Sequence, residues 1–170
     1  MPDGYLIVVA MVCRQVLGVA AGEVPIHADL SEVATWHWYD MVVAADGTAY
    51  VGNFGWDIET DYGLPQAATL AVVRPDCTVD VGPGDLLFPN GSVITPDGRT
   101  LVVGETFGRR YTAFNLDRNG TPGPGREWAP LPQSAPDGCT MDAASGTWVA
   151  ALAPSGVLRA LDWGRTTHRS

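Results

Sequence analysis

A pattern of two apolar strands joined by a glycine turn recurs along the chain and constrains the fold more than any other feature. It is found in YDMVVAADGTAYVGNFG from Tyr39, in NGSVITPDGRTLVVGETFG from Asn90 and in DGCTMDAASGTWVAAL from Asp137. In each copy the second strand starts 11 residues after the first residue, and the copies start 51 and 47 residues apart. A β unit that repeats at this period is typical of a propeller, in which four-stranded antiparallel blades pack around a central channel.

The content of turn-forming residues supports the same architecture. The 170 residues include 20 glycines and 13 prolines, which destabilise the interior of a helix, and no long stretch shows a helical period. Hydrophobic residues make up 46% of the chain, which is enough to form a core. We therefore predict an all-β propeller of about three and a half four-stranded blades over residues 1–164, followed by a polar tail at residues 165–170.

The unit that starts at Asn90 contains a complete predicted blade. Its strands are expected at Gly91–Thr95, Arg99–Thr106, Arg110–Leu116 and Arg126–Leu131. The glycine- and proline-rich segment Arg118–Gly125 is predicted to be the loop before the last strand.

The charge of the chain restricts its partners. Nineteen acidic residues and ten arginines give a net charge of −9, so the chain lacks the basic face that binds nucleic acid or an anionic membrane surface. An acidic protein of this kind suits a metal cation or a neutral small molecule.

The cysteines and the N-terminal segment indicate a cytoplasmic protein. Cys13, Cys77 and Cys139 are far apart and form no CxxC pair, so they are expected to be small buried hydrophobic residues in a reducing compartment. The apolar run Tyr5–Val12 is followed closely by Arg14 and is too short to span a bilayer. We predict that this run is a buried strand rather than a signal peptide.

The first residues of the repeats are candidate ligands. In a propeller the innermost strand of each blade begins at the channel mouth, so Tyr39, Asn90 and Asp137 are expected to converge there. Asn90 and Asp137 offer the hard oxygen atoms that Ca²⁺, Mg²⁺ or Mn²⁺ prefers. The alternative is that both are ordinary turn residues that follow Pro89 and Pro136.

Aromatic residues gather near the same predicted mouth. They are Trp36, Trp38, Tyr39, Phe54 and Trp56, of which the last two follow a strand end in NFGWD. They are interpreted either as a stacking wall for a sugar-like ligand or as packing between blades.

Several of these motifs together carry a family resemblance. PNGSVITPDGRTLVVGETFGRRYTAFNLDRNGTPGPGREWAPLP, followed by PDGCTMDAASGTWVA, resembles the SMP-30/gluconolactonase/LRE-like family, and the resemblance covers roughly residues 2–160. It implies a six-bladed propeller with one divalent metal in the channel. Such proteins hydrolyse sugar lactones or related cyclic esters, so a lactone or a sugar acid is the expected small-molecule ligand.

The resemblance also implies roles for individual residues. The family holds its metal with a Glu, an Asn and an Asp; the Asn of PNG falls on Asn90 and the Asp of PDG on Asp137, which is also the expected general base. The family has Arg-x-Asn-Asp where this chain has His37-Trp38-Tyr39-Asp40. The expected substrate contacts are His37, Tyr39, Asp40, Phe54 and Trp56.

The third metal ligand of the family has no counterpart in the printed sequence. It lies in a Glu-Gly-Pro segment of the first blade, which this sequence does not contain, and Glu105 is expected in the wall of the channel rather than as a substitute. The resemblance is thus to a fragment without the family's first and C-terminal blades.

These features predict a metal-dependent hydrolase of a sugar lactone or similar cyclic ester, a carboxylic ester hydrolase, with impaired activity in this chain. The expected metal is Ca²⁺, with Zn²⁺, Mg²⁺ or Mn²⁺ as alternatives. A non-catalytic propeller fragment, a small-molecule or metal-binding module and a piece without a stable function of its own are the alternative interpretations.

Overall fold

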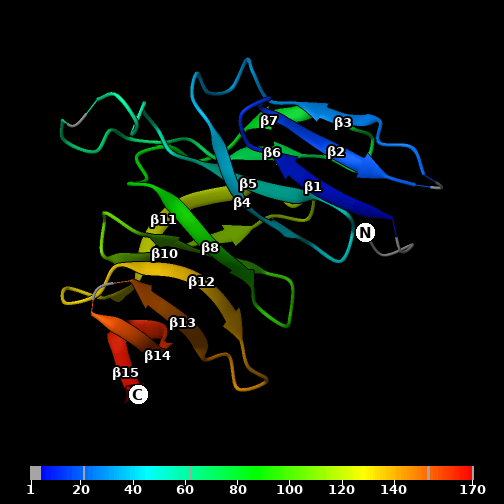
Figure 1. The fold of residues 1–170 in the computed structure, drawn as a ribbon. Coiled ribbons are helices and arrows are strands. Elements are labelled where there is room, and N and C mark those ends of the chain that lie inside the picture. The colour runs from blue at the N-terminus through cyan, green and yellow to red at the C-terminus, as the bar shows by residue number, and fades with distance from the viewer. Residues whose placement is uncertain (1–4, 21, 62, 153, 170) are drawn as a thin grey trace.

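Four antiparallel β-sheets, each with its strands in chain order, make up the protein (Figure 1). The computed structural model describes residues 5–20, 22–61, 63–152 and 154–169. The first sheet contains β1 (Leu6–Ala10), β2 (Gln15–Val19) and β3 (Ile26–Asp29). The second contains β4 (Trp38–Val43), β5 (Ala49–Asn53), β6 (Ala71–Val73) and β7 (Val79–Val81).

The two remaining sheets also have four strands each. The third contains β8 (Pro89–Ile94), β9 (Thr100–Glu105), β10 (Arg110–Leu116) and β11 (Pro122–Pro130). The fourth contains β12 (Pro136–Met141), β13 (Thr147–Leu152), β14 (Ser155–Leu161) and β15 (Arg165–Arg169). A 3-10 turn at Asp162–Gly164 is the one helical element among the described residues, and none of their helices is long and apolar enough to cross a membrane.

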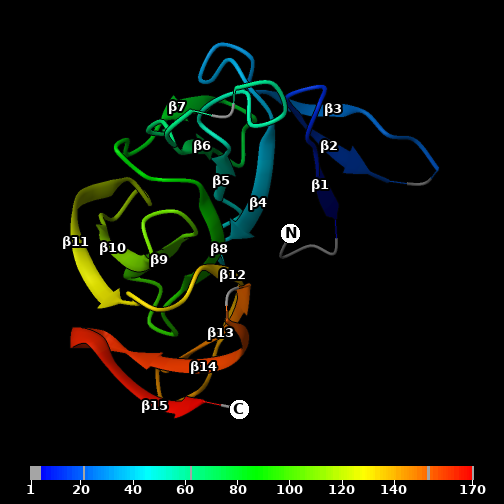
Figure 2. The ribbon, with the colours of Figure 1, turned by 60° about the vertical axis from the view of Figure 1, so that its left-hand side comes forward.

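The sheets follow one another around an arc, as the blades of a propeller do (Figure 2). The first strands of the sheets, β4, β8 and β12, lie on the inner side of the arc, and the last strands, β7, β11 and β15, lie on the outer side. The predicted all-β propeller architecture is confirmed, with three four-stranded sheets and one three-stranded sheet.

Side chains along the second strand of a sheet point alternately into the two cores on either side, and so pack against both neighbouring sheets. Val51 of β5 belongs to the core between the first and second sheets, whereas the preceding Tyr50 belongs to the core between the second and third. Likewise, Val103 of β9 packs toward the second sheet and Val102 toward the fourth. Successive side chains of a strand point to opposite faces, so a continuous apolar run is buried on both sides.

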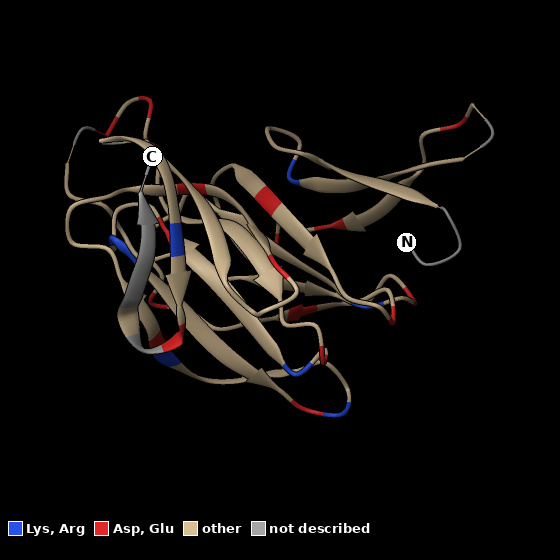
Figure 3. Ribbon diagram, turned by 90° about the horizontal axis from the view of Figure 1, so that it is seen from below, with Lys and Arg blue, Asp and Glu red and all other residues tan. Residues whose placement is uncertain are grey.

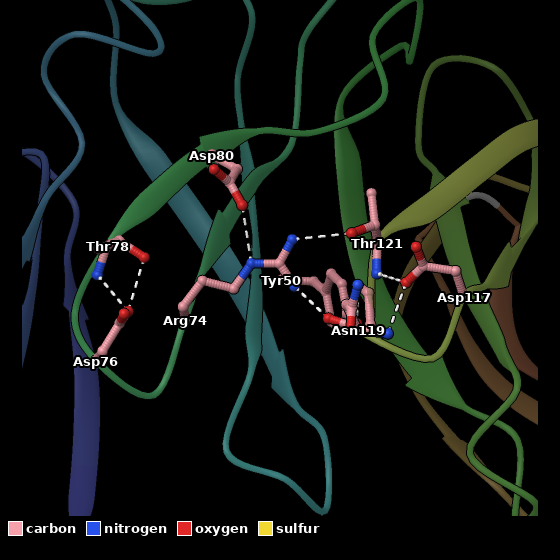
Figure 4. Close-up of polar contacts among 9 residues, drawn as sticks. Tyr50, Arg74, Asp76, Thr78, Asp80, Asp117, Asn119 and Thr121 are labelled. Carbon is pink, nitrogen blue, oxygen red and sulfur yellow. Dashed lines mark hydrogen bonds and ion pairs between the residues drawn. The ribbon is translucent and has the colours of Figure 1, made fainter.

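Just beyond the end of β6, a group of polar contacts ties the second sheet to the third (Figure 4). The Arg74 guanidinium pairs with Asp80, 2.8 Å away, and donates hydrogen bonds to the Asn119 carbonyl and the Thr121 hydroxyl. We call these four residues the Arg74 clasp. Beside it, the Tyr50 hydroxyl donates a 2.6 Å hydrogen bond to the Gly120 carbonyl, so the clasp fastens the β10–β11 turn to the second sheet.

Much of the acidic charge is used in turns, as the spread of red positions in Figure 3 illustrates. A side-chain oxygen of each turn aspartate accepts a hydrogen bond from the backbone N–H two residues ahead, which stabilises the turn. These aspartates include Asp46, Asp76, Asp97, Asp117 and Asp142. The net charge of −9 therefore reflects turn chemistry as well as any cation site.

The outer strands differ from the sequence-based expectations. β11 starts at Pro122, so the second half of the predicted loop Arg118–Gly125 is a strand, because an outermost strand tolerates prolines that lack an N–H. Arg165–Arg169, expected in the polar tail, forms β15 and pairs with β14. The fourth sheet therefore continues past the boundary predicted after residue 164.

The predicted burial of the cysteines and of the N-terminal run also differs from the structure. All three thiols are free; Cys13 and Cys77 are exposed in turns, and only Cys139 is partly buried. Within the run Tyr5–Val12, β1 buries Ile7, whereas the neighbouring Leu6 is 56% exposed. An apolar run predicts burial of both faces of a strand, but only one face of β1 is covered.

Candidate active site at the inner edge of the sheets

The first residues of β8 and β12 meet at the inner edge of the arc. The Asn90 side-chain amide donates a 2.9 Å hydrogen bond to Oδ1 of Asp137 and a 3.2 Å one to the Thr106 hydroxyl. Thr106 in turn donates to the Pro136 carbonyl at 2.8 Å, so the start of β12 is tied to the end of β9. Asn90 is buried, with 3% exposure, while Asp137 is only partly buried. The structure thus brings together the two residues that the repeat predicts to converge.

A second carboxylate, from β4, lies at the same place. Oδ2 of Asp40 accepts a 3.1 Å hydrogen bond from the Ser92 backbone N–H. Burial raises the pKa of the Asp40 carboxyl above its usual range; the backbone N–H groups of Met41 and Ser92 lower this pKa, and the Asp137 carboxylate raises it further. The site therefore contains two carboxylates, Asp40 and Asp137, that repel one another. The Asn90 amide donates a hydrogen bond to one of them, Asp137.

A glycine allows the inner strands to approach this closely. A Cβ atom added to Gly91 would overlap the backbone carbonyl of Asp137, so no other residue fits beside Asn90 without moving β8 away from β12. The Gly91 N–H also donates a 2.9 Å hydrogen bond to Oδ1 of Asn90, which holds the amide group in place. The Asn-Gly pair of the PNG motif is therefore needed as a unit.

These side chains open onto a groove of about 510 Å³. Strand β1 and the turn after it contribute Val8, Val9 and Met11 to its lining. The other three sheets contribute Tyr39, Asp40, Asn90 and Asp137. The groove therefore joins apolar side chains to a polar patch that contains both carboxylates.

A row of aromatic rings leads away from the groove along the same edge of the sheets. The rings come from residues before β4 and β8, within β4 and after β5 and β9, and neighbouring centroids are 4.3–6.4 Å apart. We call this set the aromatic row; its members are Trp36, His37, Tyr39, Phe54, Trp56, Phe88 and Phe107.

The predicted substrate contacts occupy different places in this row. Tyr39 lines the groove beside Asp40, whereas His37 and Phe54 are partly buried and Trp56 is buried, with 6% exposure. Trp38, which the sequence groups with these aromatic residues, lies outside the row. It is fully buried in the core between the first and second sheets. The packing interpretation therefore holds for Trp38, while Tyr39 is exposed at the groove.

Two members of the aromatic row were missed in the sequence. Phe107 occupies the position in TFG that Phe54 occupies in NFG of the preceding repeat, so the repeat alignment itself contained the signal. Phe88 immediately precedes the PNG motif and carries no comparable signal, because the residue before the PDG motif of the next repeat is Ala135.

Glu105 lies beneath this edge of the third sheet, completely buried. It accepts hydrogen bonds from the Arg110 guanidinium at 2.7 Å and from the Leu87 N–H at 2.9 Å, and also from the Thr112 hydroxyl. Its oxygens are fully engaged, in accord with the expectation that it belongs to the wall and does not replace the family's metal-binding Glu.

The donor atoms of the site suit a hard cation. The Asn90 amide oxygen and the Asp137 carboxylate are oxygen ligands of the kind that Ca²⁺ or Mg²⁺ takes, and no thiol or imidazole lies among the groove-lining residues. Among the described residues there is no cluster of three or more His, Cys, Asp or Glu placed to hold a metal. The oxygen atoms of Asn90 and Asp137 are therefore of the chemical kind that fits a divalent cation.

The comparisons with known proteins agree with the architecture. The family described as "SMP-30/Gluconolactonase/LRE-like region" matches residues 1–170. No curated protein sequence matches the chain. Among solved structures, regucalcin, a calcium-binding protein from Agrobacterium tumefaciens, superimposes with a TM-score of 0.81 and 23% identity over 98% of this chain and 56% of its own.

Two further structures have similar folds. A gluconolactonase from Xanthomonas campestris gives a TM-score of 0.74 and 23% identity over 96% of this chain and 57% of its own. A luciferin-regenerating enzyme gives 0.82 and 16%, over 98% of this chain and 58% of its own. The chain therefore spans less than two thirds of the length of these proteins, and at such identities the likeness concerns the fold.

Proposed function

Because this chain belongs to the SMP-30/gluconolactonase/LRE-like family, we propose that its groove hydrolyses a sugar lactone or a similar small cyclic ester. The observation that carries the proposal is the contact between Asn90 and Asp137, which stand at equivalent repeat positions and open onto the groove. Propeller geometry brings these two positions together, and the proposal is supported by the oxygen donors that both side chains offer there.

In this proposal Asp137 acts as the general base. Its carboxylate accepts a proton from a water molecule as the water oxygen attacks the lactone carbonyl carbon. The ring C–O bond then breaks, and the departing oxygen takes up a proton to give a hydroxy acid. The 2.9 Å hydrogen bond from Asn90 holds one oxygen of Asp137 and leaves the other for water.

Asn90 and Asp137 would also hold the divalent cation, with Ca²⁺ first and Zn²⁺, Mg²⁺ or Mn²⁺ as alternatives. When bound, such a cation supplies Lewis-acid polarisation of the carbonyl. Asp40 would orient the substrate from its position beside Asp137, and Tyr39, with His37, Phe54 and Trp56 behind it, would form the wall of the groove.

We further propose that activity is impaired in the 170-residue chain, because the resemblance gives counterparts for two of the family's three ligands, Asn90 and Asp137. Two oxygen ligands bind a cation more weakly than three, so the metal should dissociate at concentrations where a full site stays loaded. We expect calorimetric titration with Ca²⁺ to give weak one-to-one binding that Asn90→Ala reduces further.

The decisive experiment is lactone hydrolysis followed by proton release, with glucono-δ-lactone, with and without EDTA. We expect a slow rate above that of buffer which EDTA removes and which Asp137→Asn lowers by at least tenfold. Asp97→Asn, a turn aspartate on the opposite edge of β8 and β9, is the matched control and should keep the full rate. A metal-dependent rate that persists in Asp137→Asn would refute the assignment of the base.

A second candidate is a binding module without catalysis, favoured by the lack of a three-residue cluster of acidic, His or Cys ligands among the described residues. The same two measurements separate the candidates. Saturable Ca²⁺ binding without any hydrolysis above buffer would establish the module and exclude the hydrolase for this chain.

A further inference from the structure

Among the described residues, the exposed aromatic side chains are found at one place. Among the aromatic residues whose exposure the structure describes, only Tyr39 (37%) and Phe107 (43%) are exposed. Phe88, which is 7% exposed, packs between them, with its ring centroid 5.6 Å from that of Tyr39 and 5.4 Å from that of Phe107. One buried ring thus supports two exposed rings, of which Tyr39 lines the groove.

The backbone is strained to keep Phe88 there. Its φ of 60° lies in the left-handed region, which a bulky side chain avoids and which occurs mainly where the surrounding structure imposes it for function. Hydrogen bonds hold both sides of the residue: the Thr106 N–H donates to the Phe88 carbonyl at 3.1 Å, and the Leu87 N–H donates to buried Glu105. The strained backbone thus fixes the buried ring on which the groove-lining Tyr39 packs.

The charge and polarity of the groove restrict what can lie against these rings. Its lining carries Asp40 and Asp137 but no basic residue, so an anionic substituent would be repelled. A polyhydroxylated substituent would lose hydrogen bonds to water against Tyr39, Val8 and Met11. A neutral, flat, apolar group gains free energy from the same contact.

We propose that the preferred substrate is an uncharged lactone with an aromatic or other flat apolar substituent, rather than a polyhydroxylated sugar lactone. Its ester ring would lie at Asn90 and Asp137, and its substituent would stack on Tyr39 and extend toward Phe107. This inference rests on the proposed function, because it names the class of cyclic ester that the same groove takes.

The test measures binding separately from hydrolysis, with lactams, which keep the ring and carbonyl of a lactone but resist cleavage. Calorimetry on the full chain compares 5-phenyl-2-pyrrolidinone, unsubstituted 2-pyrrolidinone and glucono-δ-lactam. We expect the phenyl lactam to bind about tenfold more tightly than either of the others, which is the scale of one or two aromatic contacts. Equal affinities, or tighter binding of the glucono-lactam, would overturn the inference.

Two substitutions locate the preference. Phe107→Ala and Tyr39→Ala should each weaken binding of the phenyl lactam by about threefold to tenfold and leave 2-pyrrolidinone unchanged. Val157→Ala, at a side chain of similar exposure (41%) on β14, is the control and should change neither. Tyr39→Leu keeps apolar area without the ring, so it should lose most of the preference even if Tyr39→Ala folds poorly. Unchanged affinity in both Phe107→Ala and Tyr39→Leu would contradict the assignment.

Failure of the proposed function gives a different result from failure of this inference. If no lactone is hydrolysed but the phenyl lactam binds selectively, the hydrolase is refuted and the ligand preference of the groove stands. If lactones are hydrolysed but the phenyl group brings no advantage in binding, the hydrolase stands and the inference is wrong.

Discussion

The second and third sheets are joined at two edges, and each edge contains an arginine–carboxylate pair in a very different setting. At the groove edge, Arg110 pairs with Glu105, whose side chain is completely buried. At the opposite edge, Arg74 of the clasp pairs with Asp80, whose side chain is 56% exposed. The two distances are nearly equal, 2.7 and 2.8 Å, so geometry alone does not tell the pairs apart.

The difference lies in what each carboxylate organises. Glu105 accepts a hydrogen bond from the Leu87 N–H, next to the strained Phe88, and so helps to hold the buried ring that packs between Tyr39 and Phe107. The clasp fastens a turn of the third sheet to the second sheet. The comparison shows that the contacts at one end of the sheets position residues near the candidate site, whereas those at the other end connect the two sheets.

The largest effect is expected from Glu105→Ala. The substitution leaves Leu87, Thr112 and Arg110 without their common acceptor in a buried position, so we expect a loss of about 3–4 kcal/mol in the free energy of unfolding. Urea unfolding measures the loss, and Glu105→Gln, which keeps part of the hydrogen bonding, should lose less. A loss below that of Asp80→Asn would contradict the distinction between the two edges.

The close approach of β8 and β12 can be tested with a pair of glycines. Gly91→Ala places a methyl group against the Asp137 carbonyl, which must move, so we expect a loss of about 1–3 kcal/mol. Gly138→Ala is the matched control, because no atom lies within 4 Å of an added Cβ there. Both are measured by denaturant unfolding; equal losses would show that the contact between the inner strands is not tight.

The clasp edge should be sensitive to alkaline pH through Tyr50. Burial, chiefly, raises the pKa of Tyr50 to about 12, against an ordinary value of 10.0. The stabilising contribution of the neutral phenol is therefore complete below pH 10 and is lost as pH rises toward 12, which amounts to about 1 kcal/mol by pH 11. Unfolding free energies between pH 8 and pH 11 should fall less steeply in Tyr50→Phe. Parallel profiles for the two proteins would argue against a buried phenol at the clasp.

The smallest effect is expected from the exposed pair of the clasp. Asp80→Asn removes a charge that water already screens, so the free energy of unfolding should fall by less than about 1 kcal/mol. The difference from the unchanged protein should shrink further in 1 M NaCl, because salt screens exposed charges. A loss comparable to that of Glu105→Ala would show that the clasp, too, is essential for stability.

The repeat explains why so much of the fold could be predicted from the sequence. The equal spacing in the units that start at Tyr39, Asn90 and Asp137 predicts both the propeller and the meeting of the first residues of its inner strands, because equivalent positions in successive blades lie at the same edge. The meeting of Asn90 and Asp137 follows this rule. Their roles as metal ligands and as the base stay predictions.

Other features could not be predicted, because they depend on contacts between distant segments. Phe88 joins Tyr39 and Phe107 only after three strand ends have been brought together, and its left-handed backbone has no local sequence signal. The exposure of Cys13 and Cys77 similarly depends on which turns the chain makes, and hydrophobic character alone predicts the opposite.

Residue pattern along the chain thus sufficed for most of the strands, the glycine turns, the order of the sheets and the meeting of Asn90 with Asp137, because each depends on local alternation and on a repeat that is visible in one dimension. The polarity and shape of the groove depended on tertiary structure. Whether a carboxylate is saturated, as in Glu105, or open to a ligand, as in Asp137, is set by neighbours from other sheets. Burial and hydrogen bonding across sheets decide the chemistry of a side chain, and neither is a property of its own segment.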